Sequence, residues 1–162
     1  MSISQTLKAY LDHEHVHYDV LSHPEVFRAV KIAHRLHTPE KEMAKVVIVK
    51  LRERFMMTVL PASWYVDLHR LRTVFATHQL QLATEAEIKG LFPDCELGAM
   101  PPFGNLYGLP VYVDQSLTED EEIVFHAGTH SDAIRMRYWD FASLVFPVVV
   151  EFHRSPSKVC DV

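Results

Sequence analysis

The chain is poor in cysteine and contains no long hydrophobic run. Only Cys95 and Cys160 occur among its 162 residues, and they do not form a Cys-x-x-Cys pair. We therefore expect two free thiols in a reducing compartment rather than a disulfide framework. No segment approaches the roughly 18 apolar residues that span a bilayer, and the first residues lack the features of a signal peptide. These absences predict a cytoplasmic protein without a membrane partner.

The usual signatures of nucleophilic hydrolases are also missing. The sequence has no Gly-x-Ser-x-Gly elbow and no cysteine with a spaced histidine partner. Cys95 lies beside a proline-rich loop, but a nucleophilic cysteine needs a nearby base and a lowered pKa, and the sequence indicates neither. We interpret Cys95 as a structural residue.

The net charge of −5 opposes binding to DNA or another long nucleic acid. Such binding needs lysine and arginine gathered on one surface, where they contact phosphates. A single RNA terminus requires only a few such contacts. Lys41, Lys50, Arg52 and Arg54 surround one predicted strand and could supply them, and an ordinary solvated face is an equally good interpretation of these cations.

The length suits one domain, which we place at residues 1–150, followed by a C-terminal tail at 151–162. Strands and helices are unevenly interspersed, which favours an α+β fold.

A loop longer than Arg52-Glu53 is expected between the strands of the first hairpin, because this pair suits a two-residue turn poorly. The acidic stretch 118–122 is expected to be exposed. The predicted elements are helix 2–11 after a Ser2–Gln5 capping box, strand 16–20, helix 27–36, strands 44–51 and 54–60, helix 68–75, strand 79–83, helix 84–91 with a Thr84–Glu87 capping box, strands 109–113, 123–125 and 134–138, helix 140–146 and edge strand 148–150.

One pattern suggests a zinc hydrolase. His13-Glu14-His15-Val16-His17 satisfies His-Glu-x-x-His, in which two histidines one helical turn apart bind the metal and the glutamate activates water. This chemistry requires a helix. The alternation that begins at Val16 instead predicts a strand, in which the two outer histidines would lie about 13 Å apart at ~3.3 Å per residue. We expect no metal site here.

A stiff loop and two further motifs are the strongest functional signals. In Gly98-Ala99-Met100-Pro101-Pro102-Phe103-Gly104, the prolines fix φ and the glycines permit close approach. Lys45 lies within an apolar run at 43–49, and Gly128-Thr129-His130 follows a predicted strand. From these residues alone, a surface lysine, a rigid surface turn and a structural histidine are the plain alternatives.

In this order, the lysine, the Gly98-x-x-x-Pro102 loop and the Gly128-x-His130 turn resemble the YbaK family of aminoacyl-tRNA deacylases. This family includes the editing domain of bacterial prolyl-tRNA synthetases. The resemblance runs from about residue 5 to residue 147, and it implies a curved, partly closed mixed sheet of six or more strands surrounded by helices. His126 stands where a smaller polar residue is expected, which puts the specificity in question.

The resemblance also implies roles for individual residues. Lys45 would be the catalytic residue, and its charge would stabilise a phosphate or a developing oxyanion. Backbone N–H groups at Ala99 or Met100 would donate to the oxyanion. The implied substrate-binding residues are Gly98, Ala99, Met100, Pro101, Pro102, Gly104, Gly128, Thr129 and His130, and no metal or cofactor is implied.

The implied function is that of a free-standing trans-editing hydrolase, which deacylates a mischarged tRNA. The expected substrate is a small amino acid on tRNA(Pro). The expected partners are the 3′ end of the aminoacyl-tRNA and an aminoacyl-tRNA synthetase. The alternative of a different class is a binding module of the same fold, which would hold charged tRNA without cleaving it.

Overall fold

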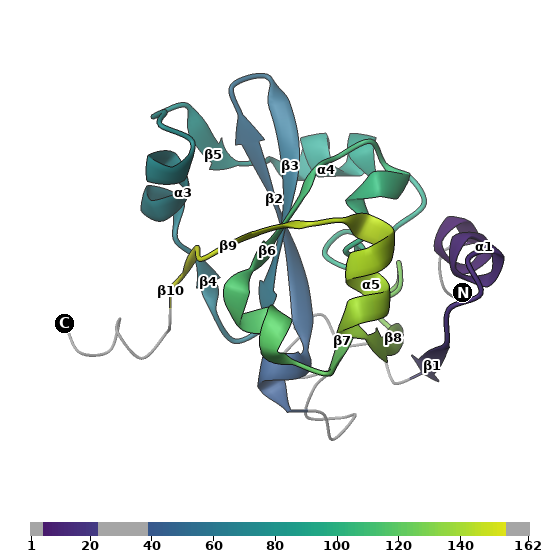
Figure 1. Ribbon diagram of the computed structural model, residues 1–162. Coiled ribbons are helices and arrows are strands. Elements are labelled where there is room, and N and C mark those ends of the chain that lie inside the picture. Colours follow the sequence, from purple (N-terminus) through teal and green to yellow (C-terminus); the bar gives the residue numbers. More distant parts are fainter. Residues whose placement is uncertain (1–4, 23–38, 155–162) are drawn as a thin grey trace.

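A long hairpin forms the centre of the molecule (Figure 1). The computed structural model describes residues 5–22 and 39–154. Strand β2 (Ala44–Leu51) pairs antiparallel with β3 (Arg54–Pro61) along its whole length. Both strands consist mainly of β-branched and large apolar residues, which favour a strand buried on both faces.

The turn of this hairpin is shorter than the sequence predicts. Leu51 pairs directly with Arg54, so Arg52 and Glu53 alone form the turn, and the expectation of a longer loop is wrong. Arg52 adopts a φ of 56°, a left-handed conformation that is uncommon for arginine. Its N–H donates a hydrogen bond of 2.8 Å to the Gln79 carbonyl oxygen on the neighbouring segment. This contact offsets the strain of the turn.

The described strands form a mixed α+β fold, which confirms the expected fold class. In the described ranges, a five-stranded sheet has the order β5-β2-β3-β6-β9, and a three-stranded antiparallel sheet has the order β1-β8-β7. Strand β6 is parallel to both β3 and β9, whereas β2 is antiparallel to β3 and β5. The larger sheet stays open and does not close into a barrel. The other strands are β1 (Tyr18–Ser22), β4 (Tyr65–Val66), β5 (Leu80–Leu82), β6 (Val111–Asp114), β7 (Glu122–His126), β8 (Asp132–Arg137), β9 (Val148–Val150) and β10 (His153–Arg154).

An isolated parallel bridge joins the two sheets. Met43, just before β2, pairs with Val124 in β7. Because the two segments run in the same direction there, the residues that follow Met43 and those that follow Val124 lie on the same side of the bridge. The arrangement brings the start of β2 beside the end of β7.

Helices cover the sheets at their edges (Figure 1). Helix α4 begins with the predicted capping box, in which Thr84 and Glu87 each accept a hydrogen bond from the backbone N–H of the other. Both the Ser2 capping box and the predicted helix at 27–36 lie outside the described residues. No helix in the described part of the chain is both long and apolar enough to span a membrane. The helices are α1 (Gln5–His13), α3 (Leu68–Val74), α4 (Glu85–Leu91) and α5 (Tyr138–Val145), with short 3-10 helices η1 (Glu40–Glu42), η2 (Gly104–Leu106) and η3 (Gln115–Glu119).

Among residues 5–22 and 39–154, two hydrophobic clusters lie in the interior. In the larger one, the ring of Phe103 packs against the rings of Phe125 and Phe141, with centroids 5.7 and 5.4 Å apart. The smaller cluster includes Phe152, which is completely buried. Ordered structure therefore extends through β10, four residues beyond residue 150, where the tail was expected to begin.

The acidic connection 118–122 is only partly exposed. Its first residues belong to η3, and the side chain of Asp120 is 2% exposed. The expectation that the whole stretch is a solvated face is therefore wrong at Asp120. Its ion-pair partner among the described residues is Lys41, whose Nζ lies 3.8 Å from Asp120 Oδ1. Burial raises the pKa of Asp120 to about 6, although Lys41 acts in the opposite direction.

Candidate functional site

The proline loop is largely buried, so it is not the surface turn of the plain alternative. Ala99 and Phe103 are completely buried, and Met100, Pro101 and Pro102 are buried as well. Gly104 is required for packing, because a Cβ at this position would lie 2.7 Å from Val111 Cγ2 and 2.8 Å from the Leu109 carbonyl oxygen. The Gly104 end of the loop therefore packs closely against the start of β6.

Gly98 is the exposed end of the loop. It adopts a φ of 86°, in the region that favours glycine. A Cβ at this position would lie 3.4 Å from Cε1 of His130. The backbone conformation therefore selects glycine at residue 98, whereas the ring lies at ordinary van der Waals distance from such a Cβ.

Hydrogen bonds join the loop to the turn that follows β7. The N–H of Gly128 donates to the Ala99 carbonyl oxygen at 2.9 Å, and the N–H of Glu96 donates to the Gly128 carbonyl oxygen at 2.8 Å. The carboxylate of Glu96 also accepts the N–H of His130 at 2.6 Å. Residues 96–104 and 128–130 therefore form one rigid unit, here named the loop–turn corner.

The His130 imidazole is part of this corner. Its Nε2 lies 2.7 Å from the carbonyl oxygen of Leu97. A carbonyl oxygen can only accept, so Nε2 carries a proton and donates. His130 cannot then act as a general base through Nε2. The ring also lies edge-to-face with that of buried His126, with centroids 5.5 Å apart.

Thr129 holds the shape of the turn. Its hydroxyl donates to one carboxylate oxygen of Asp132 at 2.8 Å, and Ser22 in β1 donates to the other at 3.2 Å. Both Thr129 and Asp132 are buried. These bonds hold the turn in shape, and substrate binding by Thr129 stays a prediction.

The backbone donors of the loop differ in what they contact. The N–H of Ala99 donates to the Glu96 carbonyl oxygen at 3.0 Å. The expectation that Ala99 can serve as an oxyanion donor is therefore wrong, because this N–H group is already used. In the described ranges, the Met100 N–H donates to no other group.

Lys45 is the second residue of β2 and is half-buried. Its Nζ lies 5.0 Å from the centroid of the Tyr65 ring. Lys45 is two residues after Met43, and His126 is two residues after Val124. Because Met43 and Val124 form a parallel bridge, Lys45 and His126 lie on the same side of it, and the Gly128 turn begins just after His126.

The four cations expected around this strand do not form one group. Lys41 precedes β2, whereas the other three lie at its far end, about 23 Å along the strand at ~3.3 Å per residue. Lys50 forms an ion pair of 2.7 Å with Glu87. This contact raises the pKa of Lys50 and lowers that of Glu87. The geometry favours the interpretation of an ordinary solvated face.

The structure opposes a catalytic role for Cys95 and for the His13–His17 segment. Burial raises the pKa of the Cys95 thiol to about 11, which is opposite to what a nucleophilic cysteine needs. Helix α1 ends at His13, and His15 has a left-handed φ of 57°, so His13-Glu14-His15-Val16-His17 does not form the helix that a zinc hydrolase requires.

Comparisons with known proteins agree with this geometry. A model of the aminoacyl-tRNA editing domain family matches residues 23–144. The chain is 27% identical over 156 residues to a protein of Escherichia coli strain K12 named multifunctional Ser/Thr-tRNA deacylase ProXp-y, and the match covers 93% of each protein. A protein of the same name from Escherichia coli O157:H7 matches equally well.

Solved structures show the same fold. A candidate trans-editing enzyme for prolyl tRNA synthetase superimposes with a TM-score of 0.82 at 19% identity, covering 94% of this chain and 97% of that one. A hypothetical protein, APE2540, superimposes with a TM-score of 0.83 at 15% identity, covering 93% and 100%.

The family match spans well over half of the chain and includes Lys45, the proline loop and the Gly128 turn. It confirms the resemblance on which the interpretation of these motifs rests. The chain therefore belongs to the aminoacyl-tRNA editing domain family and is an aminoacyl-tRNA deacylase.

Proposed function

We propose that this deacylase is a free-standing trans-editing enzyme, which removes a small amino acid from a mischarged tRNA. The expected carrier is tRNA(Pro). The resemblance to the family of prolyl-tRNA editing domains makes alanine and cysteine candidate amino acids. Serine and threonine are further candidates, because a relative is named a Ser/Thr-tRNA deacylase.

The loop–turn corner is the observation that carries the proposal. Its backbone is fixed by hydrogen bonds between Glu96, Ala99 and Gly128, and its N–H groups therefore keep their direction when substrate binds. Fixed donors stabilise a developing negative charge without the cost of reorganising. The proposed oxyanion donor is the Met100 N–H, and the prolines that follow hold it in place.

The reaction is the hydrolysis of an ester on the terminal ribose. Water attacks the carbonyl carbon, the bond from that carbon to the ribose oxygen breaks, and a proton passes from the water to the ribose oxygen. The adjacent ribose hydroxyl can position the water. Lys45 would stabilise the negative charge that develops on the carbonyl oxygen, or a neighbouring phosphate. The proposed role of the corner is to orient the ester.

Substitution of Lys45 by alanine tests its assigned role. We expect Lys45→Ala to fold normally and to lower kcat/KM for deacylation by about 100-fold or more, the usual loss when one charge-stabilising group is removed. Lys89→Ala is the matched control, because Lys89 is exposed on α4 and its loss changes the net charge equally. Wild-type rates in Lys45→Ala would remove Lys45 from the mechanism.

A panel of charged tRNAs tests the substrate. Serine, threonine, alanine and cysteine esters on tRNA(Pro) and tRNA(Ala) should be hydrolysed at different rates, with cognate prolyl-tRNA spared. Neighbouring amino acids that differ by one methylene should differ by only about 1–3 kcal/mol in transition-state binding. Equal rates on both tRNAs would contradict the tRNA(Pro) assignment. Tight binding without release of amino acid would instead indicate the binding module.

A further inference from the structure

The last described strand, β10, ends beside Tyr65, whose ring also contacts Lys45. After α5 the chain crosses the molecule to β10, which lies beside β4 (Figure 1). In this pair, Arg154 stands opposite Tyr65. The guanidinium carbon of Arg154 lies 5.8 Å from the centroid of the Tyr65 ring, and Lys45 Nζ lies 5.0 Å from the same centroid. Two cations from distant parts of the sequence thus stand beside one aromatic ring.

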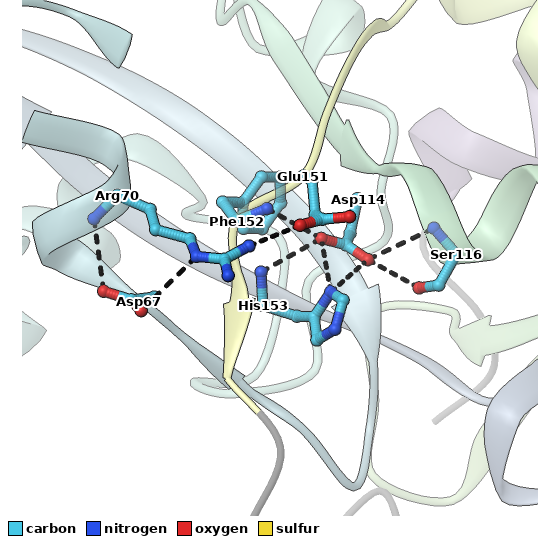
Figure 2. Close-up of polar contacts among 7 residues, drawn as sticks. All are labelled: Asp67, Arg70, Asp114, Ser116, Glu151, Phe152 and His153. Carbon is cyan, nitrogen blue, oxygen red and sulfur yellow. Dashed lines mark hydrogen bonds and ion pairs between the residues drawn. The ribbon is translucent and has the colours of Figure 1, made fainter. Parts of the chain in front are cut away.

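A buried carboxylate fixes the strand that carries Arg154. Asp114 is completely buried at the end of β6. One of its oxygens accepts the backbone N–H groups of Phe152 and His153 at 2.9 and 3.0 Å, and the other lies 3.0 Å from Nδ1 of His153. Ser116 donates to Asp114 through both its N–H and its hydroxyl (Figure 2). Because the Asp114 side chain accepts hydrogen bonds from the backbone of both residues, residues 152 and 153 are firmly held.

Further contacts hold the same segment from the side of α3. Arg70 bridges Asp67 and Glu151, with contacts of 3.8 and 2.5 Å (Figure 2). The Asp67 N–H donates to the Phe152 carbonyl oxygen at 2.7 Å. The ring of His153 stacks on Trp64, with centroids 4.1 Å apart. Arg154 therefore extends from an anchored strand, and its position is set by the fold.

The group at the end of this strand has the composition of a single-strand nucleic-acid site. Tyr65 as a residue is 46% exposed, Arg154 is exposed and Lys45 is half-buried. Proteins bind single-stranded RNA by combining exposed aromatic rings with cations that contact the phosphates. Arginine suits a phosphate because its planar donors can bind two oxygens together. On a chain of net charge −5, such contacts must be local.

We infer that Tyr65 and Arg154 form with Lys45 a binding site for the phosphate-bearing, single-stranded 3′ end of the RNA substrate. This inference rests on the proposed function, because it places the terminal nucleotides beside the residue assigned to catalysis. Asp114 acts only through the strand, as a positioning residue. The Arg154 side chain contacts the RNA, so it determines binding rather than the chemical step.

Binding and catalysis are measured separately. The probe is an uncharged RNA hairpin with a single-stranded 3′ extension ending in CCA, and its affinity is followed by fluorescence anisotropy over a range of salt. Arg154→Ala should weaken binding roughly three- to tenfold, and should reduce the slope of log K against log salt by about 0.7, the value of one single-strand phosphate contact. Arg154→Lys should retain most of that slope, and Tyr65→Leu should weaken binding.

Arg137→Ala is the matched control. Arg137 is exposed at the end of β8, on the opposite side of the view in Figure 1 from β10, and its loss changes the charge equally. Thermal melting of each variant checks that it is folded. On charged tRNA, Arg154→Ala should raise KM and leave kcat nearly unchanged. On an aminoacyl ester that lacks phosphate, its rate should equal that of the wild type.

The outcomes separate this inference from the proposed function. Wild-type affinity and salt slope in folded Arg154→Ala would overturn the inference and leave only a structural contact between the side chains of Arg154 and Tyr65. Failure of the wild-type protein to bind the hairpin would also overturn the inference. If Arg154→Ala binds the hairpin three- to tenfold more weakly than the wild type but no mischarged tRNA is hydrolysed, the inferred RNA site is supported and the proposed editing activity is contradicted.

Discussion

Gly98 couples the backbone conformation of the loop to the position of the His130 ring. We predict that Gly98→Ala lowers the free energy of unfolding by about 1–2 kcal/mol, the cost of a left-handed conformation for a residue with a Cβ. The new methyl group would also occupy the space beside His130 Cε1, at an ordinary van der Waals distance of 3.4 Å, and by narrowing the loop–turn corner it should reduce kcat/KM. Chemical denaturation and deacylation rates measure the two effects.

Gly108 provides a control for the strain alone. Its φ is 71°, yet a Cβ there would have no atom within 4 Å among the contacts of the described residues. Gly108→Ala should therefore lose similar stability and keep its activity. Equal activity losses in the two variants would show that the contact between residue 98 and His130 has no role.

Residues of the site differ in how well sequence predicts them. Lys45, Gly98 and Gly128 stand in motifs with fixed spacing. The contacts of Glu96 with His130 and of Tyr65 with Lys45 join residues far apart in sequence. No spacing or periodicity encodes such pairs. The occupied N–H of Ala99 was missed for the same reason, because its acceptor is a backbone carbonyl.

Among the helices, α4 leads directly into the loop–turn corner. We predict that Thr84→Ala lowers the free energy of unfolding by about 1 kcal/mol, because it removes the N-cap acceptor of the Glu87 N–H. Deacylation should remain near the wild-type rate, since the corner is held by its own hydrogen bonds. Denaturant titration measures the stability.

Thr73→Ala, in helix α3, is the control for the loss of a threonine side chain from a helix. The Thr73 hydroxyl donates to the His69 carbonyl oxygen on the exposed side of α3, where substitutions usually change stability by less than about 0.5 kcal/mol. If the two threonine variants lose the same stability, the cap has no special contribution.

The sequence predicts most of the helices and strands in the described ranges. Apolar runs located the hairpin, and Thr84 with Glu87 located the start of α4. Strand β10 was not predicted, because its two residues carry no periodicity and their pairing depends on Tyr65 and Val66, nearly ninety residues away. The hairpin loop was predicted too long, because the hydrogen bond from Arg52 to Gln79 comes from tertiary structure.

For the molecule as a whole, Asp120 links stability to pH. Its pKa is raised to about 6, mainly by burial, and Oδ2 has no hydrogen-bond partner in the described ranges. The folded state thus holds the proton more tightly than the unfolded state, in which the pKa is about 3.9. The contribution of Asp120 to stability is full below pH 4 and is lost as the pH rises through 6.

We predict that Asp120→Asn removes this loss, because asparagine resembles the protonated acid. The variant should gain stability over the wild type between pH 5 and pH 7.5, by at most about 3 kcal/mol at ~1.4 kcal/mol per pKa unit. Thermal or denaturant unfolding at several pH values measures the difference. A difference that does not change with pH would show that Asp120 is already ionised throughout.

The bridge between Met43 and Val124 has a mechanical consequence. Lys45 belongs to the five-stranded sheet, whereas the Gly128 turn belongs to the three-stranded sheet, and this bridge is the paired backbone that links them in the described ranges. The larger hydrophobic cluster joins the sheets as well, because it contains Ile48 and Met57 from one sheet and Phe125 and Ile134 from the other. A substitution inside this shared core would therefore move the ammonium relative to the Gly128 turn and change the rate, although it lies far from the substrate.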